Sequence, residues 1–192
     1  MNKLLAVLVL PILGLGFGSA ADSGVLRTID TEKSVMTVRV FKAGFFSGFA
    51  HDHEIRAPIE EGSFDQGNPS VQLKVDARKL RVADKDVSDK DRAEIQQTML
   101  GPKVLDSETF PEIRFRSTRV ERITDRKWLV HGQLSVHGQT RPVSIDVMEQ
   151  NGRYRGIAEL KQKEFGINPI SLAGGTVKVK NELRVEFDIV GR

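Results

Sequence analysis

Short stretches of alternating apolar and polar residues recur along the chain and predict a protein built mostly from β-strands. The stretch from Val35 to Val40 reads Val-Met-Thr-Val-Arg-Val, and its β-branched side chains favour a strand over a helix. Similar runs predict further strands over residues 54–59, 71–75, 113–119, 128–136, 143–148, 156–162 and 176–189. The pattern therefore predicts about eight strands.

Turn-forming residues separate these strands at short intervals. They include Gln66-Gly67-Asn68-Pro69, Asn151-Gly152 and Gly174-Gly175. This spacing suits antiparallel hairpins and leaves no room for the helices of parallel βαβ units. The predicted fold class is therefore all-β, as a barrel or a sandwich.

One segment departs from this pattern and predicts a short helix over residues 89–100. Ser88 is suited to cap its first turn, and Gly101-Pro102 is suited to end it. The helix would dock through its apolar residues Ile95, Met99 and Leu100. It would cover one end of the barrel or one face of the sheet, either as a lid or as a plain packing element.

The first 21 residues predict a cleaved signal peptide. Lys3 precedes an apolar run from Leu4 to about Phe17, and small residues follow up to Ala21. The run is shorter than the roughly 20 residues that span a bilayer, so we expect no integral membrane span after cleavage, although an uncleaved tether is the alternative. Residues 22–192 would then form one domain in the periplasm or outside the cell.

Composition excludes several classes of function. The chain has no cysteine, so it has neither disulfides nor thiol chemistry. Its 29 basic and 26 acidic residues nearly balance, which predicts no nucleic-acid partner. No Gly-x-Ser-x-Gly elbow is present, and Gly174-Gly175 precedes a strand rather than a helix, so the sequence lacks the signatures of acyl hydrolysis and of phosphate cradles.

The four histidines are the polar residues most relevant to a site. His51 and His53 share one strand face with Ile55, so both rings face the predicted interior. They could form a metal or redox site, grip the polar head of a ligand, or simply bond to backbone or carboxylate groups near a barrel mouth. His131 and His137 lie opposite the apolar face of their strand and point toward solvent or the following turn.

A cluster of phenylalanines precedes these histidines. It consists of Phe41, Phe45, Phe46 and Phe49, interspersed with Gly44 and Gly48. Glycine within a strand marks a bend or a close backbone approach, and together with aromatic rings it suits a shaped apolar cavity. The same residues would also suit an ordinary filled core.

Three motifs, in this order, resemble those of the YceI-like family. The first is Leu105-Asp106-Ser107 with Phe110-Pro111-Glu112-Ile113-Arg114-Phe115-Arg116-Ser117-Thr118, the second runs from Gly132 to Val143, and the third is Glu164-Phe165-Gly166-Ile167. The resemblance extends from about Val25 to the C-terminus. The segment from Ala50 to Ile55 departs from the family pattern, which suggests a different cavity mouth.

The resemblance implies a lipocalin-like, eight-stranded antiparallel barrel whose interior takes a polyisoprenoid or another isoprenoid-tailed lipid. The expected function is periplasmic binding, transport or storage of that lipid, without catalysis, without a metal and without a further cofactor. The expected ligand-binding residues are Phe41, Phe45, Phe49, His51, His53, Ile55, Val130, Leu134, Phe165 and Ile167. The alternatives are a metal- or redox-linked enzyme that uses His51 and His53, and an exported stress or interaction module with a filled core. The sequence leaves the choice between a monomer and a homodimer open.

Overall fold

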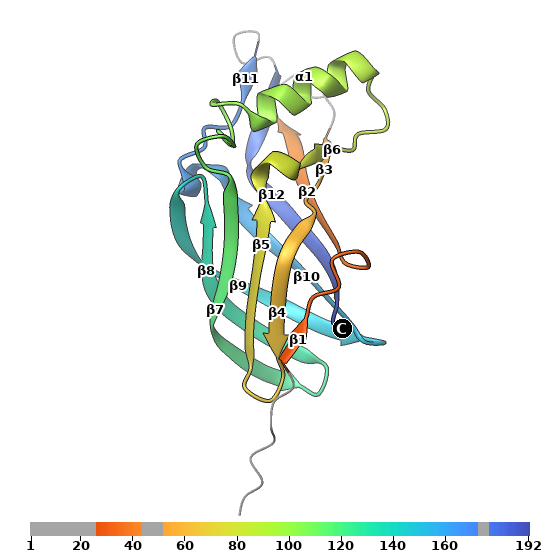
Figure 1. Cartoon of the computed structure of the whole chain (residues 1–192). Helices are drawn as coiled ribbons and strands as arrows, with labels where there is room; N and C mark the ends of the chain where they lie inside the picture. The colour runs from red at the N-terminus through yellow and green to blue at the C-terminus, as the bar shows by residue number, and fades with distance from the viewer. Residues whose placement is uncertain (1–25, 44–51, 173–176) are drawn as a thin grey trace, which may run out of the picture.

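The computed structural model describes residues 26–43, 52–172 and 177–192, which form one curled antiparallel sheet with a helix over one end (Figure 1). Within these ranges the sheet has twelve strands. They are β1 (Leu26–Thr28), β2 (Val35–Ala43), β3 (His53–Arg56), β4 (Ile59–Asp65), β5 (Ser70–Asp76), β6 (Arg81–Val82), β7 (Glu112–Thr124), β8 (Lys127–Val136), β9 (Gln139–Gln150), β10 (Arg153–Lys161), β11 (Ser171–Leu172) and β12 (Val177–Val190). The helix is α1 (Asp89–Leu100), and two 3-10 turns are η2 (Ala77–Lys79) and η3 (Gln162–Phe165).

The strands wrap around a shared interior. Their order is β1-β4-β5-β7-β8-β9-β10-β12-β2-β3-β6, and β11 pairs with β12. The segment after β1 links the two sides of the sheet, because the Ile29 amide donates to the Gly62 carbonyl (2.8 Å) and the Asp30 amide donates to the Val190 carbonyl (2.8 Å). These bonds close the sheet on itself at the end where β12 finishes.

The predicted antiparallel barrel-like fold is confirmed, but the predicted number of strands was too low. The predicted run over residues 54–59 is split into β3 and β4 by Ala57 and Pro58, because proline has no amide hydrogen for the ladder. The additional strands β1, β6 and β11 have only two or three residues each, too few to show an alternating pattern.

Alternation along the long strands separates the interior from the surface. In β9, Val143, Ile145 and Val147 are half-buried, whereas Ser144 and Asp146 are exposed. Two clusters of buried side chains form the core. One consists of Ile55, Ala57, Val75, Leu80, Val82 and Met99, and the other of Ile29, Ile59, Phe64 and Ile189.

Helix α1 has the predicted bounds and covers one end of the interior (Figure 1), which we call the helix end. The Ser88 hydroxyl oxygen accepts a hydrogen bond from the Asp91 amide at 3.1 Å, which caps the first turn. Met99 is buried in the core, and Ile95 and Leu100 pack against it, as predicted. The Gln96 side chain ties the helix to the sheet, since its oxygen accepts from the Val82 amide and its nitrogen donates to the Leu80 carbonyl, both at 2.8 Å.

Some residues of the motifs that carry the family resemblance have a role in building the fold. Ser107 is buried, and its amide (2.9 Å) and hydroxyl (3.0 Å) both donate to the carbonyl of Leu100 at the end of α1. A Cβ at Gly132 would collide with the Phe115 ring and lie 2.6 Å from the Arg116 carbonyl oxygen. Ser107 thus stabilises the end of α1, and Gly132 leaves space for the Phe115 ring.

Candidate functional site

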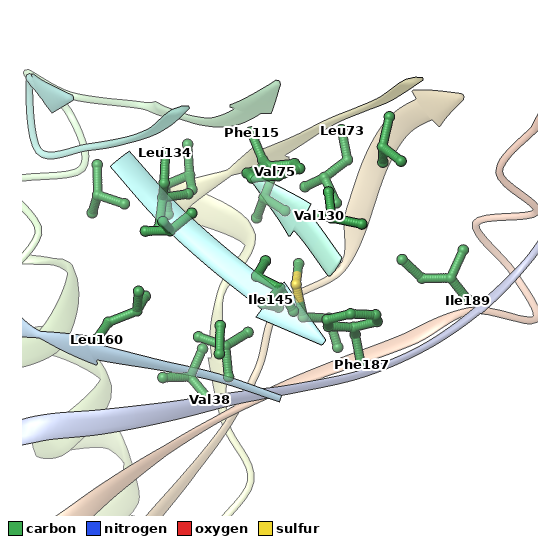
Figure 2. A pocket seen from close by; sticks show the side chains of 18 of the residues that line it. Val38, Leu73, Val75, Phe115, Val130, Leu134, Ile145, Leu160, Phe187 and Ile189 are labelled. Carbon is green, nitrogen blue, oxygen red and sulfur yellow. The ribbon is translucent and has the colours of Figure 1, made fainter. Parts of the chain in front are cut away.

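The curled sheet encloses a cavity of about 280 Å³. Its walls come from β2, β3, β4, β5, β7, β8, β9, β10 and β12, and α1 contributes Met99. Figure 2 shows side chains that line the cavity, and those labelled there are Val38, Leu73, Val75, Phe115, Val130, Leu134, Ile145, Leu160, Phe187 and Ile189. The lining is almost entirely aliphatic and aromatic, so the cavity suits an apolar ligand.

The interior ends differently at its two poles. At the helix end, the cavity meets Leu80, Met99 and Phe165, each of which is buried. At the opposite end it reaches Trp128 and Tyr154, which also line a second, adjoining hollow of about 560 Å³. We call this hollow the polar mouth; its walls are Arg27, Gln66, Pro69, Arg122, Asp125, Trp128, Glu149, Gly152 and Tyr154.

Aromatic rings mark the boundary between the cavity and the polar mouth. The Tyr154 ring lies 4.8 Å from Phe64 and 6.0 Å from Trp128, measured between ring centroids. The Tyr154 hydroxyl hydrogen-bonds to the side-chain amide of Gln66. Burial raises the pKa of the Tyr154 hydroxyl, so this group stays protonated and remains a hydrogen-bond donor at neutral pH.

Half of the predicted ligand-binding residues line the cavity. They are Ile55, Val130, Leu134, Phe165 and Ile167. Ile55 of β3 and Val130 of β8 are buried, and so are Phe165, the last residue of η3, and Ile167, which follows it. Sequence reasoning therefore identified wall residues of the cavity on several separate elements.

Phe41 does not line the cavity. The inward positions of β2 are Met36, Val38 and Val40, so alternation places Phe41 on the other face, where the Arg184 guanidinium lies 6.0 Å from its ring centroid. The prediction that Phe41 forms part of the wall was wrong in this respect, because it followed the aromatic cluster rather than the strand register. Three further predicted residues, Phe45, Phe49 and His51, lie outside the described residues.

His53 lies at the helix end and makes a polar contact there. Its Nδ1 is 2.7 Å from Oδ2 of Asp84, a buried carboxylate whose Oδ1 also accepts from the Glu54 amide at 2.6 Å. His53 is not among the cavity-lining residues. This geometry matches the reading in which the ring bonds to a carboxylate near the barrel end.

The other two histidines are held by local contacts. His131 faces outward, with its ring nitrogens 2.7 Å from the Ser144 hydroxyl and 3.0 Å from Glu121. His137 lies in the turn after β8 at a φ of 50°, and its ring packs on Phe110. Within the ranges that the structure describes, no three His, Asp or Glu side chains are grouped closely enough to hold a metal ion.

Many wall residues were not singled out by sequence reasoning. They include Met36, Val38, Val40, Leu73, Val143, Ile145, Val147, Leu160, Val185 and Phe187. The signal for most of them was present, because they occupy alternate positions of predicted strands. The polar mouth gave no such signal, since its residues come from β1 and from the turns and adjoining strand ends of three hairpins that are far apart in the sequence.

Comparison with known proteins identifies a family model, sequence relatives and solved structures that resemble this chain. The model of the YceI-like domain matches residues 28–191. Two UPF0312 proteins from strains of Vibrio cholerae serotype O1 are each 29% identical over 139 residues, which is 66% of this chain and 68% of each relative. In the described residues, no helix has both the length and the apolar character needed to cross a membrane.

Two solved structures share the fold. Burkholderia cenocepacia BcnA superposes with a TM-score of 0.63 at 20% identity and covers 84% of this chain and 98% of its own. A mutant of the Campylobacter jejuni YceI protein superposes with a TM-score of 0.52 at 12% identity, covering 72% of this chain and 81% of its own. At these identities the likeness establishes the fold alone.

Proposed function

The chain belongs to the YceI-like family of lipid-binding barrels, and from this premise we propose that it binds a polyisoprenoid-type or other isoprenoid-tailed lipid for transport or storage, without catalysis. The observation that carries the proposal is the aliphatic and aromatic cavity enclosed by the sheet. Removal of an apolar tail from water contributes about 25 cal/mol per Å² of buried surface, so such a cavity can hold a lipid without any catalytic group.

The size of the cavity limits how much of a tail it holds. Its volume of about 280 Å³ lies just below the roughly 300–1,000 Å³ typical of ligand pockets. A long prenyl chain therefore needs extra room, either through the polar mouth or by movement of flexible wall side chains. Met36 lines the cavity, is only partly buried and is suited to such movement, because methionine is unbranched and adaptable.

The cellular location forms part of the proposal. The signal-peptide pattern of residues 1–21 supports export of the domain over residues 22–192 to the periplasm or beyond the cell, although these first residues lie outside the described part of the structure. A carrier in that compartment would move or hold lipid between membranes. Western blotting of periplasmic and cytoplasmic fractions, together with the N-terminal sequence of the mature protein, tests this location.

Native mass spectrometry of the mature protein tests the binding function first. The expected result is an adduct of several hundred daltons that is lost when the protein is denatured in organic solvent, or uptake of an added isoprenoid by stripped protein. Trp128 provides an independent readout, because it is the sole tryptophan of the chain and lines the cavity. Its emission should change during a titration with prenols of increasing length.

A pair of matched variants connects binding to the cavity. Ile145→Phe adds volume at an inward position of β9, and we expect it to weaken prenol binding by tenfold or more. Ile157→Phe is the control, since Ile157 is an exposed residue on the outer face of β10. Absence of any adduct and of any uptake, or equal binding by both variants, would contradict the proposed function.

A further inference from the structure

The polar mouth lies at the end of the barrel opposite α1, next to the loops that connect β4 to β5, β7 to β8 and β9 to β10 (Figure 1). It shares Gln66, Pro69, Trp128 and Tyr154 with the apolar cavity. A lipid whose tail occupies the cavity can therefore place its polar head in this mouth without interruption. At the helix end, by contrast, the described residues Leu80, Met99 and Phe165 that line the cavity are buried and apolar.

Free hydrogen-bond donors line the polar mouth. The Gln66 side-chain amide nitrogen donates to the Tyr154 hydroxyl oxygen, so the Tyr154 O–H and the second Gln66 N–H remain available as donors. The indole N–H of Trp128 makes no hydrogen bond to any described residue, and Arg27 forms no ion pair with one. Arg27 nevertheless lies close enough to Tyr154 for its charge to act on the hydroxyl.

The acidic groups of the mouth, in contrast, already have partners. Asp125 accepts from Arg122 at 3.0 Å, and a carboxylate oxygen of Glu149 accepts from the Gly152 amide at 2.6 Å. The acids thus reduce the net charge of the mouth but leave its donors free. A ligand that satisfies this set must bring hydrogen-bond acceptors, since polar groups covered by a ligand need partners.

We propose that the polar mouth is the head-group site and that the lipid head carries oxygen acceptors, such as phosphate or carbonyl oxygens, which Arg27, Trp128 and the Gln66–Tyr154 pair bind. This inference rests on the proposed function, because it assigns the other end of the same lipid. It differs from the sequence-based expectation that His51 and His53 grip the head, because His53 lies at the helix end and bonds to Asp84.

Titrations with three probes test the head-group site. The three probes have similar tails and differ in the head. Geranylgeranyl phosphate carries a phosphate, geranylgeraniol carries a hydroxyl, and phytane has no polar head. Trp128 emission reports binding, and native mass spectrometry reports stoichiometry. We expect the wild-type protein to bind phosphate most tightly and hydrocarbon most weakly. Tyr154→Phe should weaken binding of both headed lipids, and Arg27→Gln should weaken phosphate binding about tenfold with little change for the alcohol.

Arg126→Gln is the matched control, because Arg126 is exposed in the β7–β8 turn at the same end and does not line the polar mouth. The inference is overturned if phytane binds as tightly as the phosphate, or if Arg27→Gln and Tyr154→Phe both behave like this control. In those cases the cavity would still bind lipid, and the proposed function would stand. If none of the three probes binds, the proposed function fails and the head-group site fails with it.

Discussion

The two ends of the barrel differ in how their polar groups are satisfied. At the helix end, the Gln96 side chain bonds to both Leu80 and Val82, and Ser107 bonds to the last turn of α1. At the polar mouth, the donors of Trp128 and Arg27 have no partner among the described residues. The helix end therefore contributes to the stability of the fold, whereas the mouth keeps hydrogen-bonding capacity for a ligand.

Apolar exposure shows the same contrast. Met99 at the helix end is only 7% exposed, whereas Met148, near the polar mouth, is 56% exposed. Leu26 and Ile123, at the same end as Met148, are also exposed. Met99 is packed in the core and Met148 is largely solvated, so a mutation of Met99 should affect folding and a mutation of Met148 should affect it little.

Truncation of one methionine at each end gives the largest expected difference. Met99→Ala should lower the free energy of unfolding by about 2–4 kcal/mol, because it leaves a cavity between α1 and the sheet. Met148→Ala should change it by less than about 0.5 kcal/mol, because this side chain is largely solvated. Urea unfolding followed by circular dichroism measures both, and similar losses would refute the contrast.

The glutamine bridge gives the next largest effect. Gln96→Ala should lower the free energy of unfolding by about 1–3 kcal/mol, because it leaves the Val82 amide without its side-chain partner and removes one of two side-chain donors to the Leu80 carbonyl, which keeps Arg81. Gln97→Ala is the control, because Gln97 is the next residue of the helix and its side chain is exposed. Hydrogen exchange at the Val82 amide should accelerate in Gln96→Ala alone; unchanged exchange would show that Gln96 does not hold the helix to β6.

The difference between the ends also explains what the sequence could predict. Helix α1 was predicted with its bounds, since Ser88, Met99 and Gly101 are signals that lie close together in the chain. The strands followed from alternation, and the inward positions of β8 were located correctly through Val130 and Leu134. Local patterns therefore described the elements and much of the cavity wall.

The polar mouth could not be predicted in the same way. Arg27, Gln66, Trp128 and Tyr154 are separated by tens of residues and meet only because the sheet curls. Phe41 shows the opposite failure, because its aromatic neighbours drew attention while its register in β2 turned it away from the cavity. The closure of the sheet determines the position of the mouth, and the strand register determines that of Phe41. Neither can be read from a short stretch of sequence.

Acid should weaken the helix end through Asp76. Two hydrogen bonds from the Arg78 guanidinium and one from its backbone amide hold the pKa of this buried carboxyl at about 2, below its ordinary 3.8. The stabilisation is complete above pH 3.8 and is lost as the pH falls toward 2. We expect it to be about 1 kcal/mol, because solvent screens the half-exposed Arg78. The free energy of unfolding of Asp76→Asn, measured between about pH 2 and pH 5, should therefore fall less with acid than that of the wild-type protein. An equal fall in both proteins would show that Asp76 is not the group responsible.

Removal of an ion pair at the polar mouth should have the smallest effect on stability. Asp125 is 96% exposed and pairs with Arg122, which is 64% exposed, so Asp125→Asn should change the free energy of unfolding by less than about 0.5 kcal/mol. The substitution also removes a negative charge from the mouth and frees Arg122, so binding of geranylgeranyl phosphate should strengthen by about twofold to tenfold at low salt and less at high salt. Geranylgeraniol binding should stay constant, because the alcohol carries no charge. A loss of stability comparable to that of Met99→Ala would show that the mouth is part of the structural core, and the contrast between the two ends would then fail.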